Sequence, residues 1–246
     1  MRKVAIFVEG QTEQIFVREC LLRLWEYQNV QLECRTLFTD HQYNYAEYDF
    51  PNPDAGFHFE IINVGNDNAV LPRILRREQY LWNQGFELIL GLRDMYSKDY
   101  RELNANSPGK INVELIQKFL QGAAATVKAK SSRPEKIVIH FAIMEVEAWF
   151  IGMYHYLERH HEMLTTDHIH LELGFDLQNC DPETDVYHPT DTLDSIYRLI
   201  GERYGKSRGE IEAILAHLQK EDLRGLAISG KCASFARFHT DLLRQA

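Results

Sequence analysis

The chain has 246 residues and a formal net charge of −9 at pH 7, with 45% hydrophobic and 26% charged residues. This composition is typical of a globular protein, and the length allows one large domain or two small ones. The negative charge argues against nucleic-acid binding through overall charge, although a local basic groove is compatible with it.

The sequence shows no sign of a secreted or membrane protein. Its four cysteines are scattered without a CxxC pair, which is typical of reduced, packed thiols. The first apolar run ends at Glu9, too early for a signal peptide, and no apolar stretch approaches the roughly 20 residues of a membrane helix. We therefore expect a cytoplasmic protein that does not associate with a membrane.

Apolar runs alternate with amphipathic segments through the first two thirds of the chain. In chain order we expect a strand at 4–8, a helix at 11–27, a strand at 31–38, a polar loop at 41–54, a strand at 57–64, a helix at about 70–81, a strand at 86–92, a helix at about 113–127, a strand at 136–143 and a helix after 144. The strands are mostly apolar runs, as strands buried on both faces are. This alternation predicts a doubly wound, mainly parallel sheet with helices on both faces.

The pattern becomes helical from about residue 165. Helices are expected at 192–204, 209–218 and 234–244, and the second begins with a capping-box sequence, Ser207 followed by Glu210. We therefore expect an α/β domain at 1–164 and an α-helical C-terminal extension at 165–246.

Acidic side chains follow three of the expected strands, and they are Glu9, Asp94 and the pair Glu145 and Glu147. In an open parallel sheet, sites form outside the carboxyl ends of the strands, so these acids are expected to converge. Glu13 lies four residues after Glu9 on the first helical turn and is expected to face the same place.

Carboxylates held this close repel one another unless cations or protons intervene. A set of oxygen donors without cysteine or histidine suits Mg²⁺ or Mn²⁺ better than zinc, and metal-assisted phosphoryl transfer is the chemistry that it supports best. Each acid taken singly has an ordinary explanation, because acids are common as helix caps and in first helical turns. Their occurrence at three separate strand ends favours a metal site.

Three segments carry a resemblance to a known family. In this order, FVEGQTEQIFV, ILGLRDMYSKDY and AIMEVEAWF resemble the Toprim domain in its OLD-type nuclease branch, in particular the RloB-like short proteins of bacterial defence loci. The resemblance covers roughly residues 3 to 160, and the segment 181–207 resembles the C-terminal part of the same short proteins. It implies a Toprim-like fold and a Mg²⁺-dependent nuclease that often acts beside an ABC-type ATPase.

The resemblance also implies roles for individual residues. Glu9 and Glu13 match the pair of glutamates that holds metal, Asp94 matches the first acid of an Asp-x-Asp motif, and Glu147 matches a later glutamate. The sequence departs from the family where the second acid of Asp-x-Asp is expected, because Tyr96 stands there. Asp99 is a possible substitute for that acid.

We therefore predict hydrolysis of a nucleic acid, DNA or RNA, by water that a metal ion activates. The metal ligands are expected among Glu9, Glu13, Asp94, Asp99, Glu145 and Glu147, and Lys231 is a candidate for a cation that stabilises the transition state. The alternative is a non-catalytic Toprim-fold accessory protein that binds an ATPase partner or nucleic acid, which Tyr96 favours. A homo-oligomer is compatible with either function.

Overall fold

The computed structural model describes residues 1–37, 43–45 and 48–244. The chain forms two compact units. Unit 1 comprises Met1–Asp94 and Val113–Phe141, with the C-terminal residues from Arg244, and unit 2 comprises Met95–Asn112 and Ala142–Leu243. The division expected at residue 164 is not where these units divide, because the chain passes into unit 2 directly after two sheet strands.

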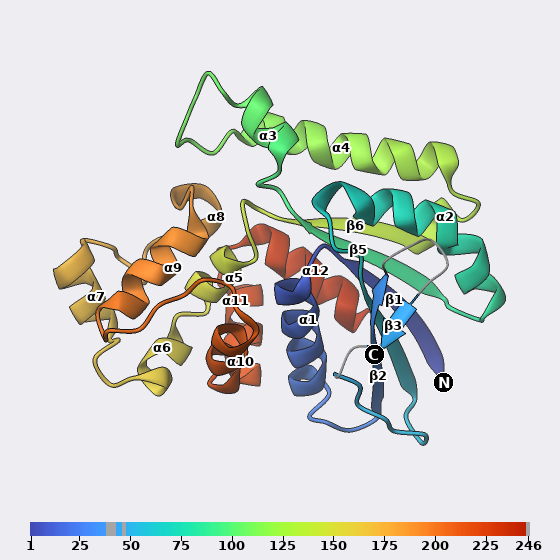
Figure 1. Ribbon diagram of the computed structural model, residues 1–246, viewed down its shortest axis with the longest axis horizontal. Helices are drawn as coiled ribbons and strands as arrows, with labels where there is room; N and C mark the ends of the chain where they lie inside the picture. Colours follow the sequence, from blue (N-terminus) through green and yellow to red (C-terminus); the bar gives the residue numbers. More distant parts are fainter. Residues whose placement is uncertain (38–42, 46–47, 245–246) are drawn as a thin grey trace. The chain divides into compact units, whose positions relative to one another are not determined.

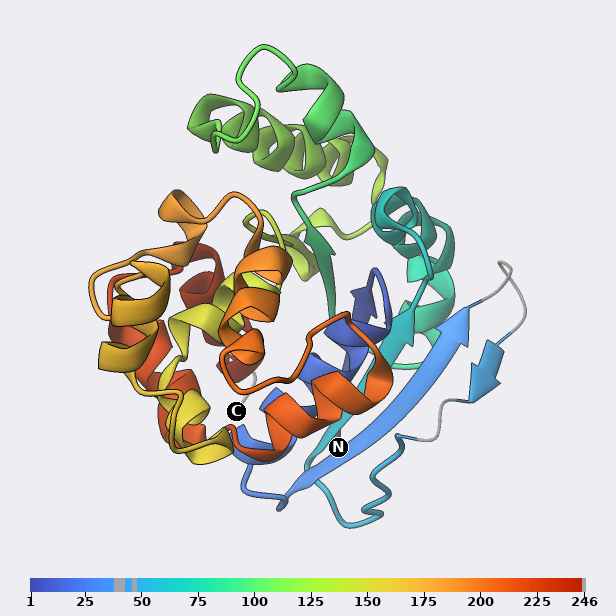
Figure 2. The same ribbon diagram turned by 60° about the vertical axis from the view of Figure 1, so that its left-hand side comes forward.

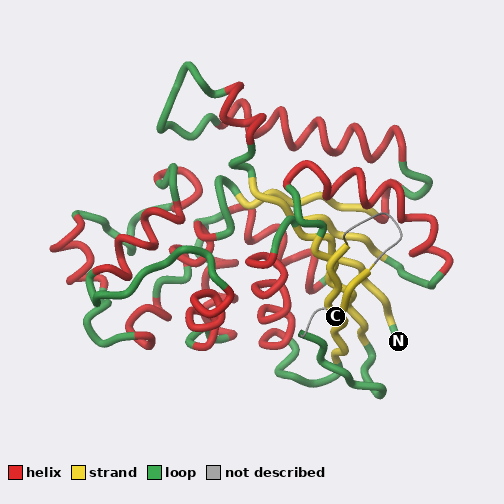
Figure 3. Tube along the Cα trace, in the orientation of Figure 1, coloured by secondary structure: helices red, strands yellow, loops and turns green. Residues whose placement is uncertain are grey.

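Unit 1 is built on a sheet with the strand order β3-β2-β4-β1-β5-β6 (Figures 1 and 3). The strands are β1 (Arg2–Val8), β2 (Val30–Leu37), β3 (Tyr43–Tyr45), β4 (Phe57–Asn63), β5 (Leu88–Asp94) and β6 (Ile137–Ala142). The pairs β1–β4, β1–β5 and β2–β4 are parallel, and the short edge strand β3 is antiparallel to β2. The mainly parallel sheet predicted from the sequence is confirmed.

Helices cover both faces of this sheet. Helix α1 (Gln11–Leu24) contacts β1, β2 and β4, whereas α2 (Val70–Asn83) contacts β1 and β5 and packs beside α4 (Val113–Lys130). The core beneath α2 and α4 consists of apolar side chains from alternate strand positions and from both helices: Ala5, Phe7, Leu37, Ile62, Val64, Val70, Ile74, Leu81, Trp82, Phe86, Ile89, Val127 and Ile137. This arrangement confirms the predicted α/β class and is consistent with a Toprim-like doubly wound fold.

Gly91, in the middle of β5, allows α2 to approach the sheet closely. A Cβ atom at this position would lie 2.9 Å from the Cδ1 atoms of both Ile74 and Ile139. The glycine therefore serves helix–sheet packing, although glycine is unfavourable in the interior of most strands.

The connections of the sheet reverse direction between β1 and β5. The chain leaves β1 through α1 toward β2 on one side, and it leaves β5 toward β6 on the other. In doubly wound sheets the carboxyl ends of two such strands border a crevice, because their connections run apart.

Unit 2 is helical, and its part from Ala142 onward is yellow to red in Figure 2. Its helices are α3 (Lys98–Leu103), α5 (Glu147–Gly152), α6 (His155–His160), α7 (Thr166–Leu173), α8 (Pro182–Asp185), α9 (Pro189–Arg198), α10 (Arg208–Ala216), α11 (Lys220–Ile228) and α12 (Ala233–Leu243). Trp149 is fully buried among them and stacks on Phe238, with ring centroids 5.6 Å apart. The predicted helical C-terminal part and the capping box of Ser207 and Glu210 are confirmed.

Some local predictions were wrong in detail. The helix expected at 11–27 ends at Leu24, and Glu26 and Tyr27 take left-handed backbone conformations. The helix expected after 144 is two short helices, α5 and α6, and the segment expected as a loop at 41–54 contains β3. Residues 38, 41, 42, 46 and 47 of the expected strand and loop lie outside the described residues. Among the described helices, none is long and apolar enough to cross a membrane.

Candidate carboxylate site

Glu9 and Asp94 meet at the carboxyl ends of β1 and β5. The strands pair in parallel up to Val8 and Leu92, so Glu9, which follows β1, and Asp94, the last residue of β5, lie at the same edge of the sheet. The backbone N–H of Asp94 donates a hydrogen bond to Glu9 Oε2, at 3.1 Å. Glu9 and Asp94 are therefore in contact within unit 1, through the backbone of Asp94.

The tight turn at Gly10 places Glu13 near the same strand end. Helix α1 begins directly after Gly10, and the carbonyl of Gly10 accepts the N–H of Gln14 at 3.2 Å. A Cβ atom on Gly10 would lie 3.0 Å from Glu13 Oε2, so the missing side chain makes room for this carboxylate. Glu13 is 5% exposed. Its acid thus lies beside the Glu9–Gly10 turn and not on the solvent face of the helix.

Unit 2 brings Glu145 and Glu147 together. The chain continues past β6 in an extended pairing, in which the N–H groups of Met95 and Tyr96 donate to the carbonyls of Ala142 and Met144. Met144 then takes a left-handed backbone conformation, with φ of 62°, and the chain turns into α5. Carboxylate oxygens of Glu145 and Glu147 lie within 4.8 Å of each other. This close approach follows from the turn, because both acids belong to one short segment.

Hydroxyl groups hold one oxygen of each carboxylate. Glu145 Oε2 accepts hydrogen bonds from the backbone N–H and the hydroxyl of Thr190, at 3.0 and 2.9 Å. Thr190 lies in the first turn of α9, where the helix dipole favours a negative charge. Glu147 Oε1 accepts a hydrogen bond from the hydroxyl of Tyr204, at 2.7 Å.

The Lys206 ammonium faces the other oxygen of each carboxylate. Its Nζ lies 3.1 Å from Glu145 Oε1 and 3.0 Å from Glu147 Oε2. Lys206 itself has a left-handed backbone, with φ of 63°. Such conformations are uncommon for residues other than glycine and cluster at functional sites.

Burial is the largest influence on the pKa of Glu147, whose side chain is fully buried. It raises the pKa of Glu147, and the Lys206 charge opposes this shift while the Glu145 charge adds to it. A cation beside Glu147 therefore favours the charged form of its carboxylate.

Sequence reasoning did not single out Thr190, Tyr204 or Lys206. All three lie in the segment 181–207. Nothing in the local spacing of that segment links these residues to Glu145.

The other candidates have different surroundings. Asp99 is exposed in the first turn of α3, and the ring of Tyr96 packs edge-on against Tyr187 and His188. Tyr96 is therefore part of an aromatic cluster and supplies no carboxylate.

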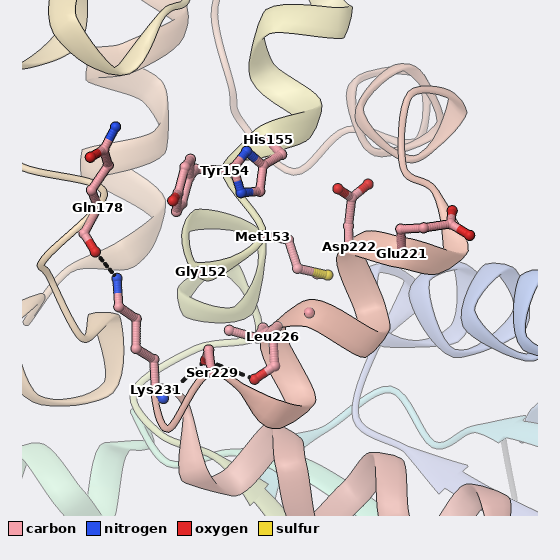
Figure 4. Close-up of a pocket in the computed structure, with 11 residues that line it drawn as sticks. Gly152, Met153, Tyr154, His155, Gln178, Glu221, Asp222, Leu226, Ser229 and Lys231 are labelled. Carbon is pink, nitrogen blue, oxygen red and sulfur yellow. Dashed lines mark hydrogen bonds between the residues drawn. The ribbon is translucent and has the colours of Figure 1, made fainter.

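Lys231 faces a pocket of about 300 Å³ within unit 2 (Figure 4). Its ammonium donates hydrogen bonds to the backbone carbonyls of Leu177 and Gln178. In the part of unit 2 that the structure describes, Lys206 and not Lys231 is the lysine that contacts the paired glutamates.

The donors fit a hard divalent cation better than zinc. Glu9, Glu13 and Asp94 in unit 1, and Glu145 and Glu147 in unit 2, offer carboxylate oxygens, which Mg²⁺ and Mn²⁺ prefer. The four cysteines are buried and unpaired, and burial raises the pKa of Cys34 and of Cys180 to about 12, so these thiols are poor metal ligands.

Comparison with known proteins gives a family but no activity. No curated protein and no solved structure matches the chain. A family model described as a domain of unknown function, DUF4276, matches residues 8–243, so the chain belongs to the DUF4276 family.

Proposed function

We propose that the protein is a Mg²⁺-dependent phosphodiesterase of the Toprim type that cleaves a nucleic acid. The observation that carries this proposal is the contact between Glu9 and Asp94 at the point where the sheet connections reverse. Structural acids are common at single strand ends. Two neighbouring strand ends that each carry an acid, at the point where the connections reverse, are a typical place for a ligand.

In this proposal each unit has metal ligands of its own. Glu9, Glu13 and Asp94 would hold a cation in unit 1, and Glu145 and Glu147 would hold a cation in unit 2. The bound cation would lower the pKa of a water molecule and stabilise charge on the leaving oxygen. The chain itself orients the donors, because the Asp94 amide fixes Glu9 and the hydroxyls of Thr190 and Tyr204 fix the other pair.

The biological setting follows from the resemblance. We propose that the protein is the effector of a bacterial defence system, that an ABC-type ATPase is its partner, and that it works in the cytoplasm. The buried, unpaired cysteines support a reducing compartment.

The second candidate function is that of a non-catalytic accessory protein. Two observations favour it. Tyr96 occupies the position expected for a second acid, and Lys206 already neutralises the Glu145–Glu147 pair. Such a protein would keep the fold and bind an ATPase or nucleic acid without hydrolysis.

A cleavage assay separates the two functions. Purified protein, alone and with the ATPase encoded beside it, is incubated with labelled single-stranded DNA, double-stranded DNA and tRNA in Mg²⁺, Mn²⁺ or EDTA. Glu9→Ala and Asp94→Ala are compared with Asp54→Ala, which removes an exposed acid of unit 1.

Cleavage that needs a metal, persists in Asp54→Ala and disappears in the other two variants supports the nuclease. Absence of cleavage with the partner present supports the accessory function. Cleavage that persists undiminished in Glu9→Ala and Asp94→Ala rejects the site.

A further inference from the structure

Lys206 contacts the carboxylates of both Glu145 and Glu147 in unit 2. One oxygen of each glutamate is held by a hydroxyl, from Thr190 or from Tyr204. The remaining oxygens, Glu145 Oε1 and Glu147 Oε2, both face the Lys206 ammonium at 3.1 and 3.0 Å. The ammonium thus lies at the position where one cation would contact both carboxylates.

A divalent ion needs this same position. Mg²⁺ binds oxygens at about 2.0–2.1 Å, so an ion shared by these two oxygens would lie between them. An ammonium already in contact with both oxygens would then be within a few ångströms of the ion, and two cations at that distance repel strongly in a buried site. Occupation by the metal and by Lys206 is therefore mutually exclusive.

Lys206 has the most exposed side chain of the three residues in this ion-pair cluster. Its side chain is 30% exposed, whereas the side chain of Glu147 is fully buried and that of Glu145 is 14% exposed. The backbone around it is held independently, because Glu210 Oε2 accepts the N–H groups of both Gly205 and Ser207. The backbone of the loop is therefore held without the ion pairs of Lys206.

We propose that Lys206 is a built-in counter-cation that competes with Mg²⁺ or Mn²⁺ for Glu145 and Glu147 and must be displaced when the metal binds. The inference rests on the proposed function only in that these two glutamates are metal ligands. A structural ion pair, in contrast, would stay in place when metal is added.

Metal binding measured without catalysis tests the competition. Mn²⁺ affinity is determined by electron paramagnetic resonance for the wild type, Lys206→Met and Lys206→Arg. Lys110→Met, which removes an exposed lysine from the same unit, is the matched control. We expect Lys206→Met to bind Mn²⁺ about tenfold more tightly or better, since a charge a few ångströms away shifts ion binding by at least this much. Lys206→Arg and Lys110→Met should bind like the wild type.

A second measurement uses the wild type alone, in case Lys206→Met does not fold. The rate of lysine acetylation by a reactive ester is followed by mass spectrometry with and without Mg²⁺. We expect Mg²⁺ to increase the modification of Lys206 severalfold and to leave that of Lys110 unchanged, because displacement exposes the Lys206 amine.

The outcomes separate this inference from the proposed function. Mn²⁺ binding that is equal or weaker in Lys206→Met, or Lys206 acetylation that metal leaves unchanged, overturns the competition even if the protein is a nuclease. Tight binding by Lys206→Met supports the competition even if no cleavage is found. If neither the wild type nor Lys206→Met binds Mn²⁺, the competition is rejected together with the metal site.

Discussion

The backbone N–H of Asp94 donates a hydrogen bond to the carboxylate of Glu9, although the two residues are 85 positions apart in the chain. The bond joins the ends of two neighbouring parallel strands. It fixes the orientation of the Glu9 side chain, so that charge and geometry can be varied separately at this position.

Glu9→Gln tests the charge alone. Glutamine keeps an oxygen that accepts the Asp94 N–H, so we expect the free energy of unfolding to change by less than about 1 kcal/mol. Metal-dependent cleavage and Mn²⁺ affinity should fall by about tenfold or more, because a carboxylate ligand is lost. Urea denaturation and the cleavage assay measure the two effects. A large loss of stability with unchanged metal affinity would show that Glu9 is a structural residue.

Gly10→Ala tests the position of the Glu13 carboxylate. The new Cβ would lie 3.0 Å from Glu13 Oε2, so the carboxylate must shift by a few tenths of an ångström. The backbone of Gly10 has φ of −146°, which alanine adopts without strain. We expect cleavage to fall on the order of tenfold, because small displacements of a catalytic group are costly, while the melting temperature changes little. Gly122→Ala, where a Cβ meets no atom within 4 Å, is the control. Equal activity of both variants would exclude Glu13 from the site.

Glu183→Ala tests the core of unit 2. Glu183 is 5% exposed and accepts hydrogen bonds from the Trp149 indole and from the backbone N–H and hydroxyl of Ser234. Its removal leaves the backbone N–H and hydroxyl of Ser234 without this acceptor, at a cost of about 1–3 kcal/mol each. The Trp149 indole keeps Ser234 Oγ as an acceptor. We expect the free energy of unfolding to fall by roughly 3 kcal/mol or more, as measured by urea denaturation. Glu172→Ala, in an exposed position of α7, should be within about 0.5 kcal/mol of the wild type.

His239→Leu tests the pH dependence of stability. Burial in α12, with a smaller contribution from Arg224, lowers the pKa of His239 from its usual value. The folded protein therefore keeps this ring neutral while the unfolded chain takes up a proton below about pH 6.5. Because the unfolded state then binds more protons, stability contributed by the neutral ring is present above that pH and is lost as the pH falls through it.

We expect the wild type to lose about 1 kcal/mol more than His239→Leu between pH 7 and pH 5.5, in urea titrations at each pH. His170→Gln, which changes an exposed histidine, should follow the wild type. Parallel curves for all three proteins would mean that His239 does not contribute to the acid sensitivity.

Apart from β3, the strands and their order of appearance could be predicted from the sequence. Strands β1, β5 and β6 are mostly apolar runs, and β2 and β4 carry apolar residues at alternate positions. The capping box at Ser207 was equally readable, since both of its partners lie within four residues. The approach of Glu9 to Asp94 followed from a general property of parallel sheets, and it needed no knowledge of side-chain positions.

Features that depend on packing between residues far apart in the chain could not be predicted from the sequence. The apolar pattern after residue 144 continues through the break between α5 and α6. The break lies at Gly152, where a Cβ would lie 2.8 Å from Leu226 Cδ1 of α11, a helix about 70 residues further along the chain. Lys206 was missed for the same reason, because its partner Glu145 is 61 positions away.

The contacts of Trp149 also determine when the core of unit 2 can form during synthesis. The indole N–H donates to Ser234, 85 positions later, and the ring packs on Phe235 and Phe238 of the same final helix. The buried core of unit 2 is therefore incomplete until α12 has left the ribosome. A nascent chain that stops before Ser234 would expose the aromatic side of α5, which makes premature termination a direct route to aggregation or proteolysis.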